Sequence, residues 1–197
     1  MKIEKTFVVL AIIGVIFKLL DWPGSGIFMI ISLTFLSMLY FPGAFYFFAD
    51  KSMKRQNTPL SIVAGLVLSI TTIGMLFRFM YWPGGAPILF IGLVGIPFVL
   101  GGILFLKSKA PEELATYYRN MVTRTSVLLI LASVFYFTPT ETLVKVQYWH
   151  DQELARLKAL HYLNPNNEAY RRQHDEYVSK KYNTQMEEDY LQNDKVK

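Results

Sequence analysis

Long hydrophobic runs separated by short polar stretches dominate the chain and predict an all-α, polytopic membrane protein. A helix that crosses a bilayer needs roughly 20 largely apolar residues. Four runs approach or exceed that length. A fifth, shorter run is followed by Pro139, and we expect a kinked helix to continue past this proline. The runs cover residues 6–20, 27–48, 60–81, 87–106 and 125–137.

The runs pair into two transmembrane hairpins, each reversing at a short turn. We therefore expect a first hairpin over residues 1–50, a second over 58–107, a polar connector over 108–124, a fifth transmembrane helix over 125–147 and a polar helical tail over 148–197. Within the tail, the turn signal at residues 164–167 predicts two short helices.

One motif occurs twice, at an offset of 60 residues, and marks the turn of each hairpin. Residues 14–24 read GVIFKLLDWPG and residues 74–84 read GMLFRFMYWPG. Proline and glycine favour chain reversal, and tryptophan is typical of a membrane interface. The repeated positions are our candidate functional residues: Gly14, Phe17, Lys18, Trp22, Pro23, Gly24, Gly74, Phe77, Arg78, Trp82, Pro83 and Gly84.

The basic residue of the motif allows two interpretations. Lys18 and Arg78 each lie about one turn before the end of an apolar run, so their long stems can reach the headgroups from within the membrane. Alternatively, each charge is held inside the bundle for a partner, an ion path or a lipid headgroup. Asp21 lies three positions after Lys18, but the second copy has Tyr81 there, so an ion pair is not common to both copies.

Composition narrows the classes of function. Hydrophobic residues make up 52% of the chain, charged residues only 18%, and mean hydropathy is +0.28. In a membrane protein, the net charge of +5 indicates topology and contact with anionic lipid rather than nucleic acid. The chain has no cysteine, which excludes disulfides, cysteine-bound metals and thiol catalysis.

The distribution of lysine and arginine predicts the orientation in a bacterial inner membrane. Basic residues follow the second and fourth runs, and neither Trp-Pro-Gly turn carries one; the loop residues are Lys51, Lys54, Arg55, Lys107, Lys109, Arg119 and Arg124. The N-terminus and both basic loops are thus expected in the cytoplasm. Five spans then place the tail in the periplasm, whereas a re-entrant fifth segment leaves it in the cytoplasm.

The sequence offers little catalytic chemistry. No acidic residue lies inside the first four runs, and Glu141 falls near the end of the fifth span, where an interfacial position is expected. His150, His161 and His174 are spread over the tail without metal-ligand spacing. No nucleophile motif, phosphate loop or dinucleotide fingerprint occurs. We expect no catalytic residues, no cofactor and no metal, and thus no enzyme.

Each hairpin resembles a known family. Residues 14–18, GVIFK, resemble the first-helix motif of the GldL-type gliding-motility and type IX secretion motor proteins of Bacteroidota, and residues 91–94, IGLV, resemble the second helix of that family. The likeness covers residues 6–48 and 71–106. It implies the hairpin fold, with Lys18 and Arg78 at the position of the basic residue of the motif.

Two departures limit what this resemblance implies. The family carries a membrane glutamate in its second helix, held to serve a proton path, but the matching positions here are Leu36 and Ile96. The family also has one hairpin and a long cytoplasmic coiled region, in place of the two hairpins, fifth span and short tail expected here. The resemblance therefore extends to the hairpin and not to proton-driven motor function.

These observations favour a non-catalytic structural or accessory subunit of an inner-membrane complex, associated by its hairpins with gliding motility or type IX secretion. We expect its partners to be other membrane-protein subunits or further copies of itself, together with anionic lipid. The alternative is a small transporter, channel or lipid-binding protein that uses Lys18 and Arg78. A third reading is a motor stator whose acidic residue is supplied by another subunit.

Overall fold

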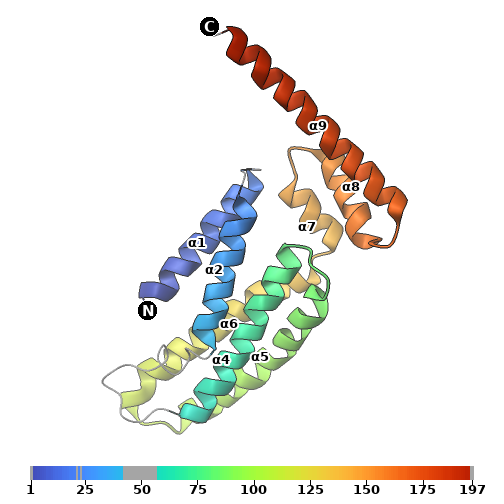
Figure 1. Cartoon of the computed structure of the whole chain (residues 1–197). Coiled ribbons are helices and arrows are strands. Elements are labelled where there is room, and N and C mark those ends of the chain that lie inside the picture. The colour runs from blue at the N-terminus through green and yellow to red at the C-terminus, as the bar shows by residue number, and fades with distance from the viewer. Residues whose placement is uncertain (1, 21, 23, 42–56, 196–197) are drawn as a thin grey trace. The chain divides into compact units, whose positions relative to one another are not determined.

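The computed structural model describes residues 2–20, 22, 24–41 and 57–195. Over these residues the fold is all-α, as expected, with eight α-helices and one 3-10 turn. The chain divides into two compact units, Met1–Thr138 and Pro139–Lys197 (Figure 1). The first holds α1 (Lys2–Leu19), α2 (Ser25–Tyr40), α4 (Thr58–Phe79), α5 (Gly85–Ser108), η1 (Glu112–Leu114) and α6 (Ala115–Phe137), and the second holds α7 (Thr140–Gln147), α8 (Gln152–Leu163) and α9 (Glu168–Lys195).

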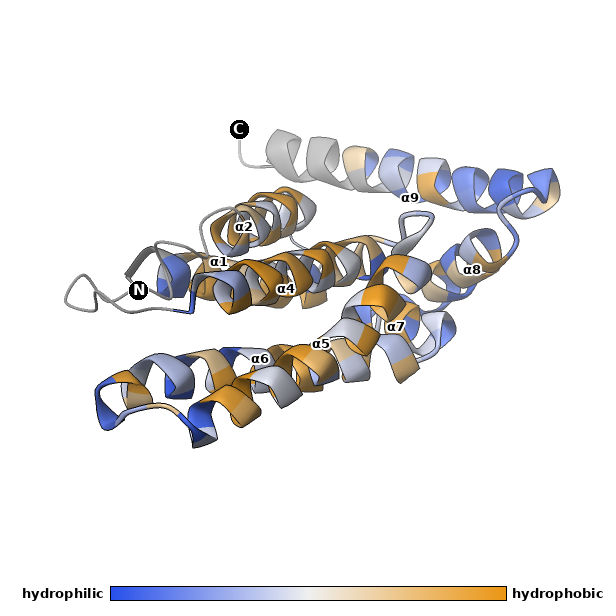
Figure 2. Cartoon of the chain, turned by 90° about the horizontal axis from the view of Figure 1, so that it is seen from below, coloured by the Kyte–Doolittle hydropathy of each residue, from blue (hydrophilic) through white to orange (hydrophobic). Residues whose placement is uncertain are grey.

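Within the part of the chain that the structure describes, three helical segments are long and apolar enough to cross a membrane: Thr58–Phe79, Gly85–Ser108 and Glu112–Phe137. They correspond to the third, fourth and fifth of the expected spans. Helix α2 is also apolar, with 16 described residues, and the expected end of its run, residues 42–48, lies outside the described residues. Hydrophobic residues predominate along α4 and α5, whereas the described part of α9 is mostly hydrophilic (Figure 2).

The fifth helix has different limits from those expected. It begins at Ala115, inside the expected polar connector, because Tyr117, Tyr118 and Met121 are buried against the bundle between polar residues. It ends at Phe137, because Pro139 lacks a backbone donor and holds Thr138 in an extended conformation. Residues 140–147 form the separate helix α7, which belongs to the second unit.

Helix α4 is the centre of the first unit, where it packs against α2, α5 and α6. Glycine allows the closest approach: a Cβ atom on Gly74 would lie 2.7 Å from the Cα of Leu89 on α5. In the first hairpin, a Cβ on Gly14 would lie 3.0 Å from the Sδ of Met29 on α2. Both contacts join positions related by the offset of 60 residues, so the two hairpins pack through the same pair of positions.

The second unit is a small helical domain with its own buried residues, among them Val144, Leu154 and Leu157. The carboxylate of Asp151 accepts three hydrogen bonds: from the backbone N–H of Leu154 (2.9 Å), the hydroxyl of Tyr177 (3.0 Å) and the ammonium of Lys181 (2.8 Å). Partial burial raises the pKa of Asp151, but these three bonds outweigh that effect and hold the pKa below its ordinary value. The helix break between Leu163 and Glu168 agrees with the predicted turn, although α9 is long rather than short.

The glycine contacts predict a graded response to added methyl groups. Gly74→Ala requires the backbone of α5 to move, and we expect a loss of about 1–3 kcal/mol in the free energy of unfolding. Gly101→Ala is the matched control on α5, because no atom lies within 4 Å of its Cβ position. Thermal unfolding of the purified protein in detergent, followed by circular dichroism, measures the difference, and equal melting temperatures would contradict this account of the packing.

Candidate functional site

The repeated motif forms a helix C-terminal cap. At the end of α4, the N–H of Trp82 donates to the carbonyl of Phe77 (2.9 Å), and the N–H of Tyr81 donates to the carbonyl of Arg78 (3.4 Å). Tyr81 has a φ of +57°, in the left-handed region. This pair of bonds around a left-handed residue is a Schellman motif, which satisfies carbonyls that a helix end leaves without partners.

The spacing of phenylalanine and tryptophan follows from this cap. A Schellman motif is commonly completed by a hydrophobic contact between the two residues joined by the bond that spans more of the chain. The rings of these two residues, Phe77 and Trp82, lie 5.1 Å apart. In the first copy, the N–H of Trp22 donates to the carbonyl of Phe17 (2.9 Å), and the rings lie 4.6 Å apart. Both copies therefore use the aromatic pair to fix the end of a helix.

The Pro-Gly dipeptide then reverses the chain. Gly84 has φ and ψ of +86° and −4°, and the N–H of Gly85 donates to the carbonyl of Trp82 (3.3 Å). A glycine at this geometry, preceded by proline, forms a type II turn. Gly24 has φ and ψ of +85° and −6° in the first copy, where Asp21 and Pro23 lie outside the described residues. The motif is thus a structural device that joins two antiparallel helices.

Arg78 is held inside the first unit by the end of α6. Its Nε donates to the carbonyl of Phe135 (3.3 Å), and its Nη2 donates to the carbonyl of Thr138 (2.9 Å). These carbonyls belong to the negative end of the helix dipole, which attracts a cation. The sequence allowed either a side chain that reaches the lipid headgroups or a charge held within the bundle, and these contacts match the second interpretation. Lys18, its counterpart, is half-buried near the end of α1.

A second charged cluster lies in the first unit, and sequence reasoning missed it. Arg124 on α6 binds Glu4 on α1 through two bonds, from Nε to Oε1 (2.6 Å) and from Nη2 to Oε2 (2.7 Å). Both charged side chains are only 13% exposed. The hydroxyl of Tyr40 on α2 also donates to Glu4 (3.3 Å). Three helices therefore meet at one buried carboxylate.

Hydroxyl groups provide further links between helices. Ser37 on α2 and Ser69 on α4 share a hydrogen bond of 2.7 Å, and Ser61 on α4 and Tyr117 on α6 share one of 2.5 Å. A hydrogen bond between apolar helices fixes their register, because neither group finds water inside a bilayer. The polar side chains of the first unit thus connect its helices to one another.

The remaining sequence candidates are apolar core positions and histidines of the tail. Leu36 and Ile96, the positions that match the family glutamate, are buried apolar residues of the core. His161 and His174 stack with ring centres 5.7 Å apart. Among the described residues, no three histidine, aspartate or glutamate side chains lie close enough to hold a metal ion.

Comparison of the chain with protein-family models, curated proteins and solved structures finds no match.

The Glu4–Arg124 pair gives a prediction about stability. Glu4→Gln leaves the Arg124 charge buried without its counter-charge, and we expect the free energy of unfolding to fall by about 3 kcal/mol. Glu141→Gln is the matched control, because its ion pair with Lys145 is exposed, and we expect no measurable change. Denaturation in detergent followed by circular dichroism checks both variants. If Glu4→Gln and the wild type have the same free energy of unfolding, the buried pair does not hold the helices together.

Proposed function

We propose that this chain is a non-catalytic structural or accessory subunit of a membrane-protein complex, and that it recruits its partner through α9. The observation that carries the proposal is the length of α9. Its 28 residues extend about 42 Å, against about 18 Å for α8, which packs against it. The ion pair of Lys181 with Asp151 lies near the end of this packing.

Beyond Lys181, two apolar side chains of α9 are exposed. Tyr182 is 67% exposed and Met186 is 64% exposed, and their spacing of four residues places them on the same side of the helix. The part of α9 beyond Lys181, residues 182–195, is about as long as the isolated helices that are only marginally stable in water. We call Tyr182 and Met186 the stripe of α9. A partner that covers this stripe would supply apolar contacts for both side chains, as in other complexes where a helix binds a groove.

The polar groups of the first unit support a scaffold role over transport. Arg78 contacts the carbonyls that end α6, and Glu4 binds Arg124 and Tyr40. A transport path lined by Lys18 and Arg78 requires that these charges face a solute. The contacts of Arg78 instead fix the position of α6 against α4.

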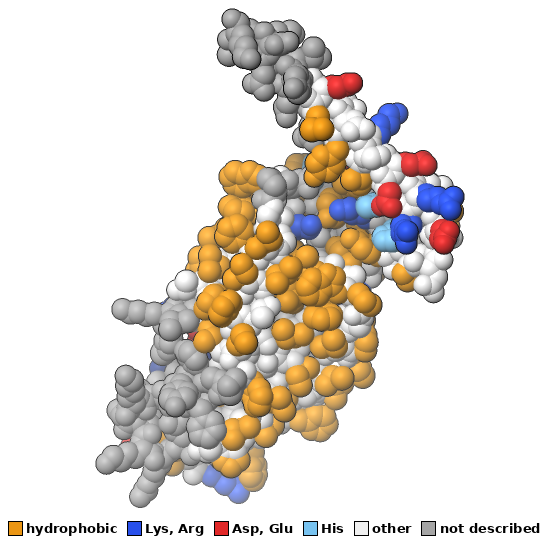
Figure 3. Space-filling model, in the orientation of Figure 1, with side chains coloured by type: hydrophobic (Ala, Val, Ile, Leu, Met, Phe, Trp, Pro, Cys, Tyr) orange, Lys and Arg blue, Asp and Glu red, His pale blue; other side chains and the backbone are white. Residues whose placement is uncertain are grey.

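We further propose that the first unit crosses a bacterial inner membrane five times, with α1 and α2 as the first two spans. The N-terminus then lies in the cytoplasm and the second unit in the periplasm. Apolar side chains cover the face of the first unit seen in Figure 3, which suits contact with lipid. By the resemblance of its hairpins, we assign the complex to gliding motility or type IX secretion.

The five-span topology predicts the accessibility of single cysteines, which the native chain lacks. Ser179→Cys, on an exposed part of α9, should react with an impermeant maleimide in intact spheroplasts. Ser108→Cys, at the end of α5, should react only after the membrane is permeabilised. Protection of Ser179→Cys in intact spheroplasts, followed by reaction once the membrane is permeabilised, would show that the segment containing α6 does not cross the membrane.

The subunit hypothesis predicts a partner that depends on the stripe of α9. Gentle detergent extraction through a C-terminal tag should recover a stoichiometric partner with the native chain, and the double variant Tyr182→Ser/Met186→Ser should lower its recovery about tenfold. Lys180→Ser/Thr184→Ser is the matched control, because it changes two exposed residues of the same helix at the same spacing. Quantitative mass spectrometry measures recovery. A lone monomer from the native chain would contradict the proposal, as would equal loss in both variants.

A further inference from the structure

Helices α4 and α5 pack tightly along one half of their length and separate along the other. In the tight half, a Cβ on Gly92 would lie 2.8 Å from the Cα of Thr71, and a Cβ on Gly95 would lie 3.0 Å from Val67. Past Pro97, which lies inside α5, the spacing changes. Seven residues after Gly95, on the same face of α5, the Cβ position of Gly102 has only Leu60 within 4 Å, at 3.8 Å.

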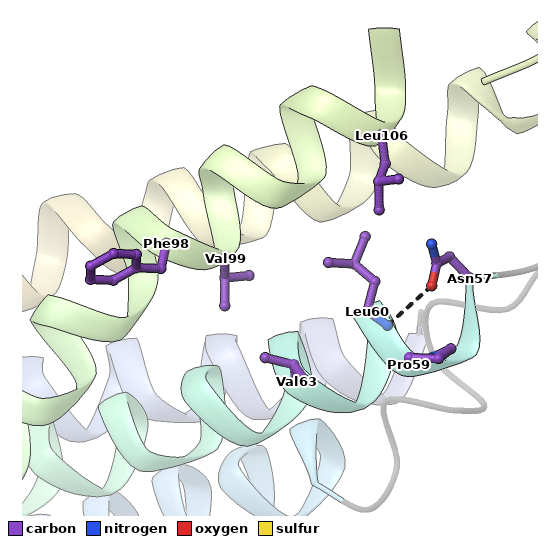
Figure 4. A pocket seen from close by; sticks show the side chains of 7 residues that line it. All are labelled: Asn57, Pro59, Leu60, Val63, Phe98, Val99 and Leu106. Carbon is purple, nitrogen blue, oxygen red and sulfur yellow. Dashed lines mark hydrogen bonds between the residues drawn. The ribbon is translucent and has the colours of Figure 1, made fainter. Parts of the chain in front are cut away.

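The separation leaves a groove of about 380 Å³ between the start of α4 and the end of α5. Figure 4 shows side chains of the two helices facing each other across it, with Phe98 at one end and Leu106 and Asn57 at the other. Its lining is apolar except for Asn57, and the apolar residues are Pro59, Leu60, Val63, Phe98, Val99 and Leu106.

The groove is open to the surroundings of the bundle. Phe98 is 78% exposed and Val63 is 51% exposed, on helices that are apolar enough to span a membrane. From Phe98 to Leu106 the groove follows α5 for about 12 Å, which is most of the thickness of one leaflet, about 15 Å. A hydrocarbon chain of the bilayer that enters the groove therefore meets apolar walls over most of its depth.

Among the described residues, the polar and basic groups near the groove lie at its end beside the helix termini. Figure 4 shows the side-chain oxygen of Asn57 capping α4 and its nitrogen on the side of Leu106. Exposed Lys107 follows Leu106 directly, and the ammonium of exposed Lys109 lies 4.3 Å from the centre of the Phe105 ring on the preceding turn. An amide donor at the groove and two lysines at the adjoining end of α5 match the ester and phosphate of a phospholipid in that leaflet.

We propose that this groove binds one acyl chain of an anionic phospholipid, with Asn57 near the ester group and with Lys107 and Lys109 beside the phosphate. A helix of a second copy or of a partner is the competing occupant, because a helix about 10 Å across can cover an open groove of this volume without entering it. The inference depends on α4 and α5 crossing the membrane, and not on the subunit role.

The experiment is native mass spectrometry of the full chain in mild detergent, titrated with phosphatidylglycerol or with phosphatidylcholine of the same acyl chains. We expect one tightly retained phosphatidylglycerol, preferred over phosphatidylcholine by about tenfold. Leu106→Trp fills the groove and should lower the bound fraction by about fivefold or more. Leu104→Trp is the matched control, because Leu104 is 48% exposed on the same helix and does not line the groove.

A second variant separates the headgroup from the acyl chain and does not alter the core. Lys107→Gln/Lys109→Gln should abolish the preference for phosphatidylglycerol and leave binding of phosphatidylcholine unchanged. Glu112 and Glu113 lie shortly after these lysines, so the variant tests whether the basic charge dominates at this end. Absence of a retained lipid, equal loss in Leu106→Trp and Leu104→Trp, or a lipid-free dimer of the native chain would each overturn the proposal.

Discussion

The need to satisfy the polar backbone groups at helix ends is the constraint on which the structure of the first unit depends. The last carbonyls of a helix have no partners in that helix, and the hydrocarbon core of a bilayer, next to which these helices would end, offers none. At the end of α4, the amides of Tyr81 and Trp82 supply two of the missing donors. The reversal that follows needs the left-handed conformation of Gly84, so the whole Trp-Pro-Gly motif is a solution to one problem of hydrogen bonding.

The same constraint explains the contacts of Arg78. Helix α6 ends at Phe137 because proline follows Thr138, and a proline cannot donate a backbone hydrogen bond. The guanidinium of Arg78 supplies donors to the carbonyls of Phe135 and Thr138 instead. A residue of the hairpin turn therefore also fixes the end of the next helix, which ties α6 to the second copy of the repeat.

Glycine decides where the two helices of a hairpin touch and where they part. The α4–α5 contact is closest at Gly74 and Gly92, and the helices open past Pro97 into the groove beside Leu60. The α4–α5 hairpin is therefore closed at one end by a close contact between the helices and open at the other as an apolar groove. The second unit differs in kind, because its charged, exposed helix α9 extends beyond α8.

Much of the local structure could be predicted from sequence, because it depends on residues that are close along the chain. Hydrophobic runs gave the apolar helices, and the spacing of Phe77, Trp82 and Gly84 contains a complete local cap and turn. The limits of α6 were harder to predict, because its first turns are polar along the sequence and are apolar only on the buried face that carries Tyr117 and Met121.

By itself, then, the sequence determined the all-α class, the apolar helices and the two hairpin turns, since hydropathy and turn chemistry act over neighbouring residues. Only the tertiary structure decided which distant groups meet. Glu4 and Arg124 are separated by 120 positions, and Arg78 reaches backbone carbonyls 57 and 60 positions away. No periodicity or motif encodes such pairings, because they arise from the way in which whole helices pack against α4.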